Sequence, residues 1–259
     1  MTDPIVPSLA GMPNFRDIGG HATTQGRTVR RGLVFRSGES ARLTTDDIDA
    51  LSALDIRLIM DLRSEKERMA SPQRWPLGVE TELIETNIRA DLRADNQSLS
   101  QILHDDPTPA GASLMMRITY EALPDACGPS LGLLFERLAN GRAPTLFHCT
   151  LGRDRTGLVS AMLQHVLGVP YPQIAADYLK TNQLLDTEET RNTAREFLRT
   201  SYGFEADAET LDILSLVRLQ NLETSYRVIA EKYGSPENYL SAYGIGDDLL
   251  EVLRQRLLD

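Results

Sequence analysis

The chain has 259 residues, of which 41% are hydrophobic and 25% are charged, and its formal net charge is −10. This length and composition predict a globular protein with a sizeable core, organised as a single domain over residues 1–259. The acidic balance argues against a nucleic-acid partner, because general nucleic-acid binding needs a basic surface to neutralise phosphates.

No apolar run approaches the ~18 residues that a membrane span requires, so we expect no stable membrane insertion. The first residues show neither the basic nor the apolar region of a signal peptide. Two cysteines, Cys127 and Cys149, cannot make a disulfide framework, and no Cys and His cluster has zinc spacing. We therefore expect a reducing, cytoplasmic location, no metal and no other cofactor, while export without a signal peptide stays open.

Strand and helix patterns alternate in the first part of the chain. Residues 13–40 are rich in Gly and Arg and indicate turns and short strands. Residues 43–55 predict a helix, with acidic residues in its first turn and apolar side chains on one face. A buried strand is predicted at 56–62, a charged helical turn at 64–70 and a second strand at 79–88.

The middle of the chain is harder to assign. Residues 91–125 are polar and predict loop with one or two helices. A helix follows at 130–140, ending at a glycine, then a short buried strand at 143–148. Residues 156–168 predict a helix that is apolar almost all round, which is typical of a central helix.

The alternation predicts an α/β fold with a central, mostly parallel sheet flanked by helices. Residues 92–123 are expected to add a mobile helical cover, and residues 171–259 a mainly helical extension of the same domain. Ligands of such sheets bind outside the carboxyl ends of the strands. Residues 148–155 lie at the carboxyl end of a predicted strand, so this segment is the candidate site.

The candidate segment has the properties of a phosphate-binding loop. A turn that runs from a strand to a helix start directs backbone N–H groups and the helix dipole at one point. Gly152 lets the turn close, and the guanidinium of Arg155 fits two phosphate oxygens. The predicted phosphate-binding residues are Cys149, Thr150, Leu151, Gly152, Arg153, Asp154 and Arg155.

The same positive field favours a thiolate at Cys149, which could attack phosphorus in line and form a phosphocysteine that water then hydrolyses. Thr156 is placed to stabilise the departing thiolate. A lone cysteine is more commonly a small core residue, which is the interpretation for Cys127. For His148 two interpretations stay open, a hydrogen-bonding support of the loop and an ordinary loop histidine.

The segment HCTLGRDRTG resembles the HCxxGxxR[ST]G signature of cysteine-dependent protein tyrosine phosphatases. More narrowly, it is similar to the atypical bacterial members with HCxxGKDRTG, and residues 14–20, 33–43, 61–67 and 176–182 also fit them. The resemblance implies a cysteine-phosphatase-like fold and a phosphotyrosine protein or peptide as substrate, with dual specificity or phosphoinositide hydrolysis as further options. Arg153 stands where those members carry Lys, so a preference for inositol phosphates is not carried over.

The leaving oxygen needs a proton, and three aspartates are candidates for the general acid. Asp91 ranks first, since it follows the second strand, where the resembled enzymes carry a mobile acid loop. Asp154 ranks second, with orientation of Arg155 or assistance to hydrolysis as its other roles. For Asp61 we prefer a buried ion pair with Arg63 or Arg16.

Arg16 and Asp17 either support the loop from below or form a plain surface pair. Two alternatives to a phosphatase are another thiolate enzyme, such as a sulfurtransferase or an arsenate reductase, and a non-catalytic phosphate-binding module. The loop form argues against a sulfurtransferase, and the shortage of resolving cysteines argues against an arsenate reductase. The presence of Cys149, Arg155 and Thr156 together argues against a module without activity.

Overall fold

The computed structural model describes residue 7 and residues 9–259, except for 76–79, 90–96, 186 and 204. Its sheet has five strands in the spatial order β1-β2-β5-β3-β4. The strands are β1 (Arg16–Asp17), β2 (Val34–Ser37), β3 (Leu58–Asp61), β4 (Glu82–Glu85) and β5 (Thr145–His148). Only the edge strand β1 pairs antiparallel in this sheet, which confirms the predicted α/β class with a mostly parallel sheet.

The register brings three polar residues to one edge of the sheet. Ser37 at the end of β2 and Asp61 at the end of β3 both pair with His148 at the end of β5. The parallel order explains this, because neighbouring parallel strands end on the same side. Cys149 follows His148, so the candidate loop leaves the sheet between two other strand ends.

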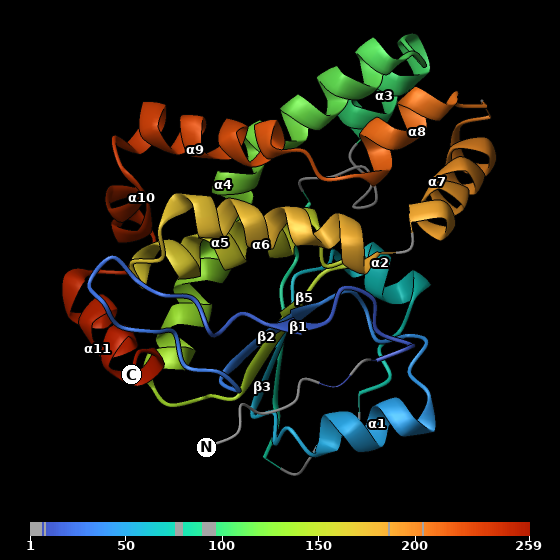
Figure 1. Ribbon diagram of the computed structural model, residues 1–259. Coiled ribbons are helices and arrows are strands. Elements are labelled where there is room, and N and C mark those ends of the chain that lie inside the picture. Colours follow the sequence, from blue (N-terminus) through green and yellow to red (C-terminus); the bar gives the residue numbers. More distant parts are fainter. Residues whose placement is uncertain (1–6, 8, 76–79, 90–96, 186, 204) are drawn as a thin grey trace.

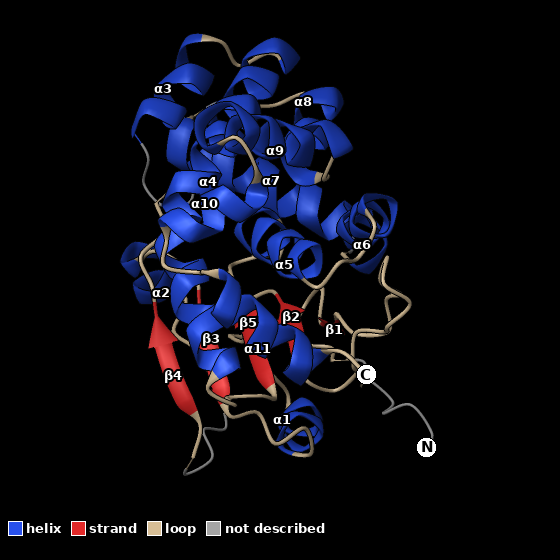
Figure 2. Ribbon diagram, turned by 90° about the vertical axis from the view of Figure 1, so that its left-hand side faces the viewer, coloured by secondary structure: helices blue, strands red, loops and turns tan. Residues whose placement is uncertain are grey.

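The helices lie mostly on one side of the sheet, with α1 on the other (Figures 1 and 2). α5 contacts β2 and β5, and α6 packs on α5. The helices are α1 (Thr45–Ser52), α2 (Glu65–Ala70), α3 (Gln97–Asp105), α4 (Pro109–Ala139), α5 (Asp154–Val166), α6 (Tyr171–Leu184), α7 (Thr187–Tyr202), α8 (Ala208–Ser215), α9 (Leu219–Tyr233), α10 (Pro236–Ala242) and α11 (Asp247–Leu257). The helical extension predicted after residue 171 is therefore confirmed.

The helix predicted at 130–140 is wrong in extent, since it is the last third of the 31-residue α4. Pro124 lies inside this helix and leaves the carbonyl of Tyr120, four residues earlier, without its N–H partner. The hydroxyl of Ser225 on α9 donates to that carbonyl at 2.6 Å. Tertiary packing thus supplies the bond that the proline removes, which the local sequence could not indicate.

Part of the cover expected at 92–123 lies inside the core. Met115, Tyr120 and Leu123 are buried in the main hydrophobic cluster, and α3 packs along α4. These side chains of α4 therefore belong to the scaffold and not to an exposed amphipathic face. A cover formed by α3 and the residues before it stays a prediction.

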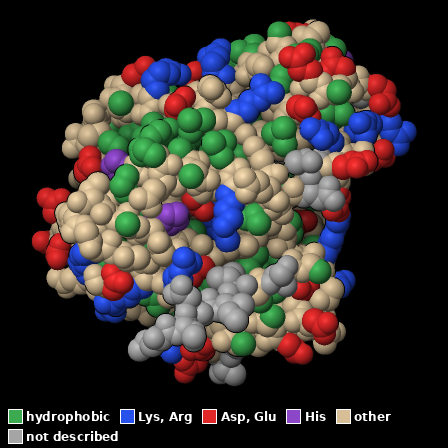
Figure 3. Space-filling view, viewed as in Figure 1, with side chains coloured by type: hydrophobic (Ala, Val, Ile, Leu, Met, Phe, Trp, Pro, Cys, Tyr) green, Lys and Arg blue, Asp and Glu red, His purple; other side chains and the backbone are tan. Residues whose placement is uncertain are grey.

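The surface mixes charges of both signs. On the face shown in Figure 3, Lys and Arg side chains are scattered among acidic ones and do not form a continuous stripe. Among the helices of the described part of the chain, none has the length and apolar content needed to cross a membrane.

Candidate active site

The candidate site is the loop between β5 and α5. Cys149 is 3% exposed, and Gly152 has φ +63° in the turn. A Cβ on Gly152 would lie 2.3 Å from the Ser37 carbonyl group, so only glycine fits there. α5 begins at Asp154, two residues earlier than predicted. Its first turn therefore includes Arg155 and directs the helix dipole into the loop.

Two buried side chains hold the loop from below through the Gly152 carbonyl. Asn14 Nδ2 donates to this oxygen at 2.6 Å and Arg36 Nη2 at 2.8 Å. Arg16 donates to the side chain of Asn14 and pairs with Asp177 at 2.8 Å, and Asp177 also pairs with Arg36 at 3.1 Å. Arg16 thus supports the loop indirectly, which agrees with the predicted support and not with a plain surface pair. The sequence patterns did not indicate the roles of Asn14, Arg36 and Asp177.

Asp17 does not share this role. Its carboxylate accepts the backbone N–H groups of Gly19 at 2.7 Å and Gly32 at 2.6 Å, so it ties together the two ends of the segment that connects β1 to β2. Burial raises the pKa of Asp17 above its ordinary value despite these hydrogen bonds. The paired support predicted for Arg16 and Asp17 therefore holds for Arg16 alone.

Arg36 brings positive charge close to the thiol. Burial, together with Arg16, lowers the pKa of Arg36 to about 9, while Asp177 and Cys149 act in the opposite direction. At neutral pH the guanidinium stays charged. Arg36 therefore adds a second buried cation to the field that Arg155 and the N-terminus of α5 direct at the loop.

Arg155 is held by Glu67, which the sequence analysis did not select. Both oxygens of Glu67 accept from the guanidinium, at 2.7 Å and 2.6 Å, and Arg155 is 1% exposed. Ser64 fixes the same carboxylate, since Ser64 and Glu67 form a capping box at the start of α2. Thr150 of the loop also donates to Glu67. The Glu67 carboxylate therefore links α2 to Thr150 of the loop and to Arg155.

We expect Glu67→Gln to lower both kcat and stability. The substitution leaves a buried Arg155 without its ionic partner, which should reduce the free energy of unfolding by about 3 kcal/mol. Misplacement of the guanidinium should lower kcat by about tenfold or more. Thermal unfolding and steady-state kinetics check both effects, with Glu65→Gln on the exposed side of α2 as the matched control.

The ion pair of Glu67 and Arg155 predicts that the stability of the protein falls at acid pH. Burial alone would raise the pKa of Glu67, but the hydrogen bonds and charge of Arg155 lower it to about 2, from an ordinary value of 4.5. A depressed folded pKa stabilises the protein above about pH 4.5, and this contribution is lost as the pH falls toward 2. Unfolding measured across this window should show a smaller loss in Glu67→Gln than in the wild type, while carboxylates such as Asp61, whose pKa is also lowered, contribute to both.

Asp61 forms the buried ion pair that we preferred. Its oxygens accept from Arg63 at distances down to 2.9 Å, and both side chains are fully buried. Burial would raise the pKa of Asp61, yet His148 and Arg63 hold it below its ordinary value. Of the two partners considered, Arg63 and not Arg16 pairs with Asp61. An ionised carboxylate held in this way does not fit the role of a proton donor.

His148 supports the loop from inside the sheet edge. Its Nδ1 lies 3.3 Å from the Cys149 carbonyl, its Nε2 lies 3.9 Å from Asp61, and no part of the residue is exposed. Burial lowers the pKa of His148 despite the nearby Asp61. The ring of Trp75 lies against it, with centroids 5.8 Å apart. A ring enclosed in this way fits the supporting interpretation.

Asp154 is fixed by two neighbours. Tyr120 Oη donates to its carboxylate at 2.5 Å, and Arg153 Nε lies 2.9 Å from the other oxygen. Thr156 is fully buried, and its hydroxyl has no hydrogen-bond partner in the described part of the structure. Asp91, the first-ranked acid, lies outside the described residues.

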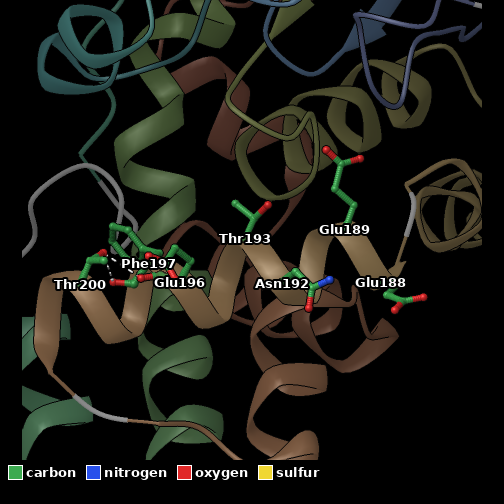
Figure 4. A pocket seen from close by; sticks show the side chains of 7 residues that line it. All are labelled: Glu188, Glu189, Asn192, Thr193, Glu196, Phe197 and Thr200. Carbon is green, nitrogen blue, oxygen red and sulfur yellow. Dashed lines mark hydrogen bonds between the residues drawn. The ribbon is translucent and has the colours of Figure 1, made fainter.

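A cavity of about 170 Å³ adjoins the loop and is lined in part by Thr150, Leu151 and Arg42. Two of its other lining residues, Glu189 and Thr193, belong to α7 and also line a wider hollow along that helix. In Figure 4 these two side chains point to the same side of α7. A continuous surface thus leads from the phosphate loop to α7. Within the described residues, no group of three or more His, Cys, Asp and Glu is placed to hold a metal.

Comparison with known proteins identifies the family of the chain. The model of a tyrosine phosphatase family matches residues 7–259. A Cupriavidus necator protein named as a tyrosine-protein phosphatase is 32% identical over 92% of this chain and 82% of its own. The triple specificity protein phosphatase PtpB of Mycobacterium tuberculosis is 30% identical over 98% of this chain and 99% of its own. Among solved structures, that of P. aeruginosa TpbA in complex with pTyr aligns with 73% of this chain and 89% of its own chain, at 16% identity and a TM-score of 0.32.

A phosphate-binding loop that holds a cysteine and an arginine at the end of a parallel strand defines a cysteine-dependent phosphatase. The chain belongs to the tyrosine phosphatase family. This membership confirms the predicted class of enzyme, a protein tyrosine phosphatase.

Proposed function

We propose that Cys149 is the nucleophile of this phosphatase. Its sulfur attacks phosphorus, the P–O bond to the leaving group breaks, and the leaving oxygen takes a proton from a carboxylic acid. Water then attacks the phosphocysteine, which releases inorganic phosphate and restores the thiolate. The observation that carries the proposal is the loop itself, which holds the buried Cys149 and Arg155 at the start of α5, with the charge of Arg36 acting on Cys149.

Arg155 clamps the phosphoryl oxygens, and Glu67 fixes the direction of its guanidinium. The backbone N–H groups of residues 150–155 complete the cradle. Thr156 stabilises the sulfur as the phosphocysteine breaks down. His148, Asp61 and Arg16 act as supports behind the loop, through the contacts described above.

The substrate that we propose is a phosphotyrosine protein or peptide, whose flanking residues lie along the surface from Thr150 to α7. The name of the PtpB relative, a triple specificity phosphatase, supports a test of phosphoserine, phosphothreonine and phosphoinositide as well. Two free, buried cysteines support a reducing compartment such as the cytoplasm.

Turnover of four substrates without added metal tests the proposal: a phosphotyrosine peptide, a phosphothreonine peptide, a phosphoserine peptide and a phosphoinositide in detergent. We expect the phosphotyrosine peptide to be hydrolysed fastest. Activity should survive EDTA, because arginine and N–H groups supply the positive charge, and vanadate or thiol alkylation should block it. Loss of activity in EDTA that added metal restores would contradict this mechanism.

Asp91 remains our candidate for the general acid, so Asp91→Asn should depress turnover according to the leaving group. Phosphotyrosine releases a phenolate whose pKa is about 10, and we expect a loss of about a hundredfold for it. An aryl phosphate with a more acidic phenol should lose far less. In the pH profile of kcat, the fall in rate that reports deprotonation of the general acid should also disappear.

Asp154→Asn is the comparison variant for this test. The Asp154 carboxylate is engaged by Tyr120 and Arg153, which suits an ionised positioning group better than a proton donor. Its loss should therefore be similar for both leaving groups. If Asp154→Asn shows the leaving-group dependence and Asp91→Asn does not, the proton comes from within the loop.

A further inference from the structure

The side chain of Arg153 is directed at a helix, although its backbone belongs to the phosphate loop. Arg153 is 4% exposed. Its Nη1 donates to the carbonyls of Leu214 and Ser215, both at 2.7 Å, in the last turn of α8. Carbonyls at this end of a helix lack intrahelical partners and carry partial negative charge, so a guanidinium stabilises them.

The other edge of the same guanidinium engages the active-site loop. Arg153 Nε lies 3.1 Å and 2.9 Å from the two oxygens of Asp154. Tyr120 donates to the same carboxylate, and its hydroxyl lies 2.7 Å from that of Tyr178. Asp154 is therefore held between α8, through Arg153, and the paired tyrosines of α4 and α6.

We propose that Arg153 is a positioning residue that fixes the Asp154 carboxylate against the C-terminal end of α8. The inference rests on the proposed function, in which Asp154 belongs to the reacting site. It also accounts for arginine at a position where similar loops carry lysine. A guanidinium offers separate edges to a carboxylate and to two carbonyls, whereas an ammonium is a single point donor.

A consequence concerns the substrate. The Arg153 side chain is committed to protein groups on both edges, so it does not serve a second phosphate of the substrate. The enzyme should then depend on one phosphoryl group, held by the cradle and Arg155. α8, far from the loop in sequence, becomes part of the frame that sets the geometry of Asp154.

A double-mutant cycle between Arg153→Met and Asp154→Asn tests this role. We expect Arg153→Met to lower kcat for a phosphotyrosine peptide by about tenfold, with KM nearly unchanged because the cradle remains. Asp154→Asn should lower kcat at least as much. The double variant should be no slower than Asp154→Asn alone, because Arg153 acts through Asp154.

Asn182→Ala is the matched control. Asn182 holds the same segment two residues beyond α8, through the backbone N–H and carbonyl of Val217, both at 2.9 Å. It does not bond to Asp154. We expect its kcat to stay within about twofold of the wild type, and its effect to multiply with that of Asp154→Asn.

Two results would overturn the proposal: losses of Arg153→Met and Asp154→Asn that multiply, or an Asn182→Ala variant as slow as Arg153→Met. If Arg153→Met does not fold, Arg153→Lys replaces it in the double-mutant cycle. Its loss of kcat should be smaller, and it should likewise add nothing to the loss caused by Asp154→Asn. All variants retain Cys149 and Arg155. Alkylation-sensitive turnover in the parent thus tests the proposed function separately.

Discussion

Cys149→Ser is expected to lower kcat by at least about four orders of magnitude while binding of the phosphate ester remains. A serine hydroxyl is a far weaker nucleophile than a thiolate, and the neighbouring His148 does not fit as its base, because its Nδ1 faces the Cys149 carbonyl and its Nε2 lies toward Asp61. The cradle does not change, because the Gly152 carbonyl stays bonded to Asn14 and Arg36. Turnover and equilibrium binding of a phosphotyrosine peptide, measured on one preparation, separate the two properties.

Cys127→Ala is the control for this experiment. Cys127 is fully buried in α4 and is not part of the loop, so its replacement should affect stability more than kcat. A Cys149→Ser variant that turns over within about tenfold of the wild type would rule out covalent catalysis by this residue.

Arg155→Lys should lower kcat by at least about a hundredfold although the charge is kept. A lysine loses the bidentate fit to phosphate, and it also loses the paired contacts with Glu67 that fix its direction. The loss should therefore appear in kcat as well as in kcat/KM.

Arg137→Lys gives the corresponding surface control, because Arg137 pairs with Glu82 at the partly exposed edge of the sheet. We expect it to match the wild type in kinetics. An Arg155→Lys variant that raises only KM would show that Arg155 contributes equally to ground-state and transition-state binding.

The phosphate loop could be predicted because its chemistry is local. Cys149, Gly152, Arg155 and the start of α5 lie within the seven residues 149–155, and a strand before them and a helix after them are enough to place them. The mostly parallel pairing of the sheet could be predicted for a similar reason, since alternating strands and helices favour parallel pairing.

The supports of the loop could not be predicted, because they come from distant parts of the chain. The spacing of Ser64 and Glu67 indicates a capping box, yet nothing local shows that the same carboxylate meets Arg155, 88 residues away. Asp177 on α6 meets Arg16 and Arg36 only after the helices pack on the sheet. Such contacts depend on the tertiary fold, which periodicity does not describe.

Trp75 has a practical consequence for following the reaction. It is the only tryptophan in the sequence, and its ring lies against His148, the residue that precedes the proposed nucleophile Cys149. Intrinsic fluorescence excited at tryptophan therefore originates beside the active site. Arrival of a phosphate ester, or formation of a charged covalent intermediate, should change the emission within a single turnover. Stopped-flow measurements can then time each chemical step without any attached label.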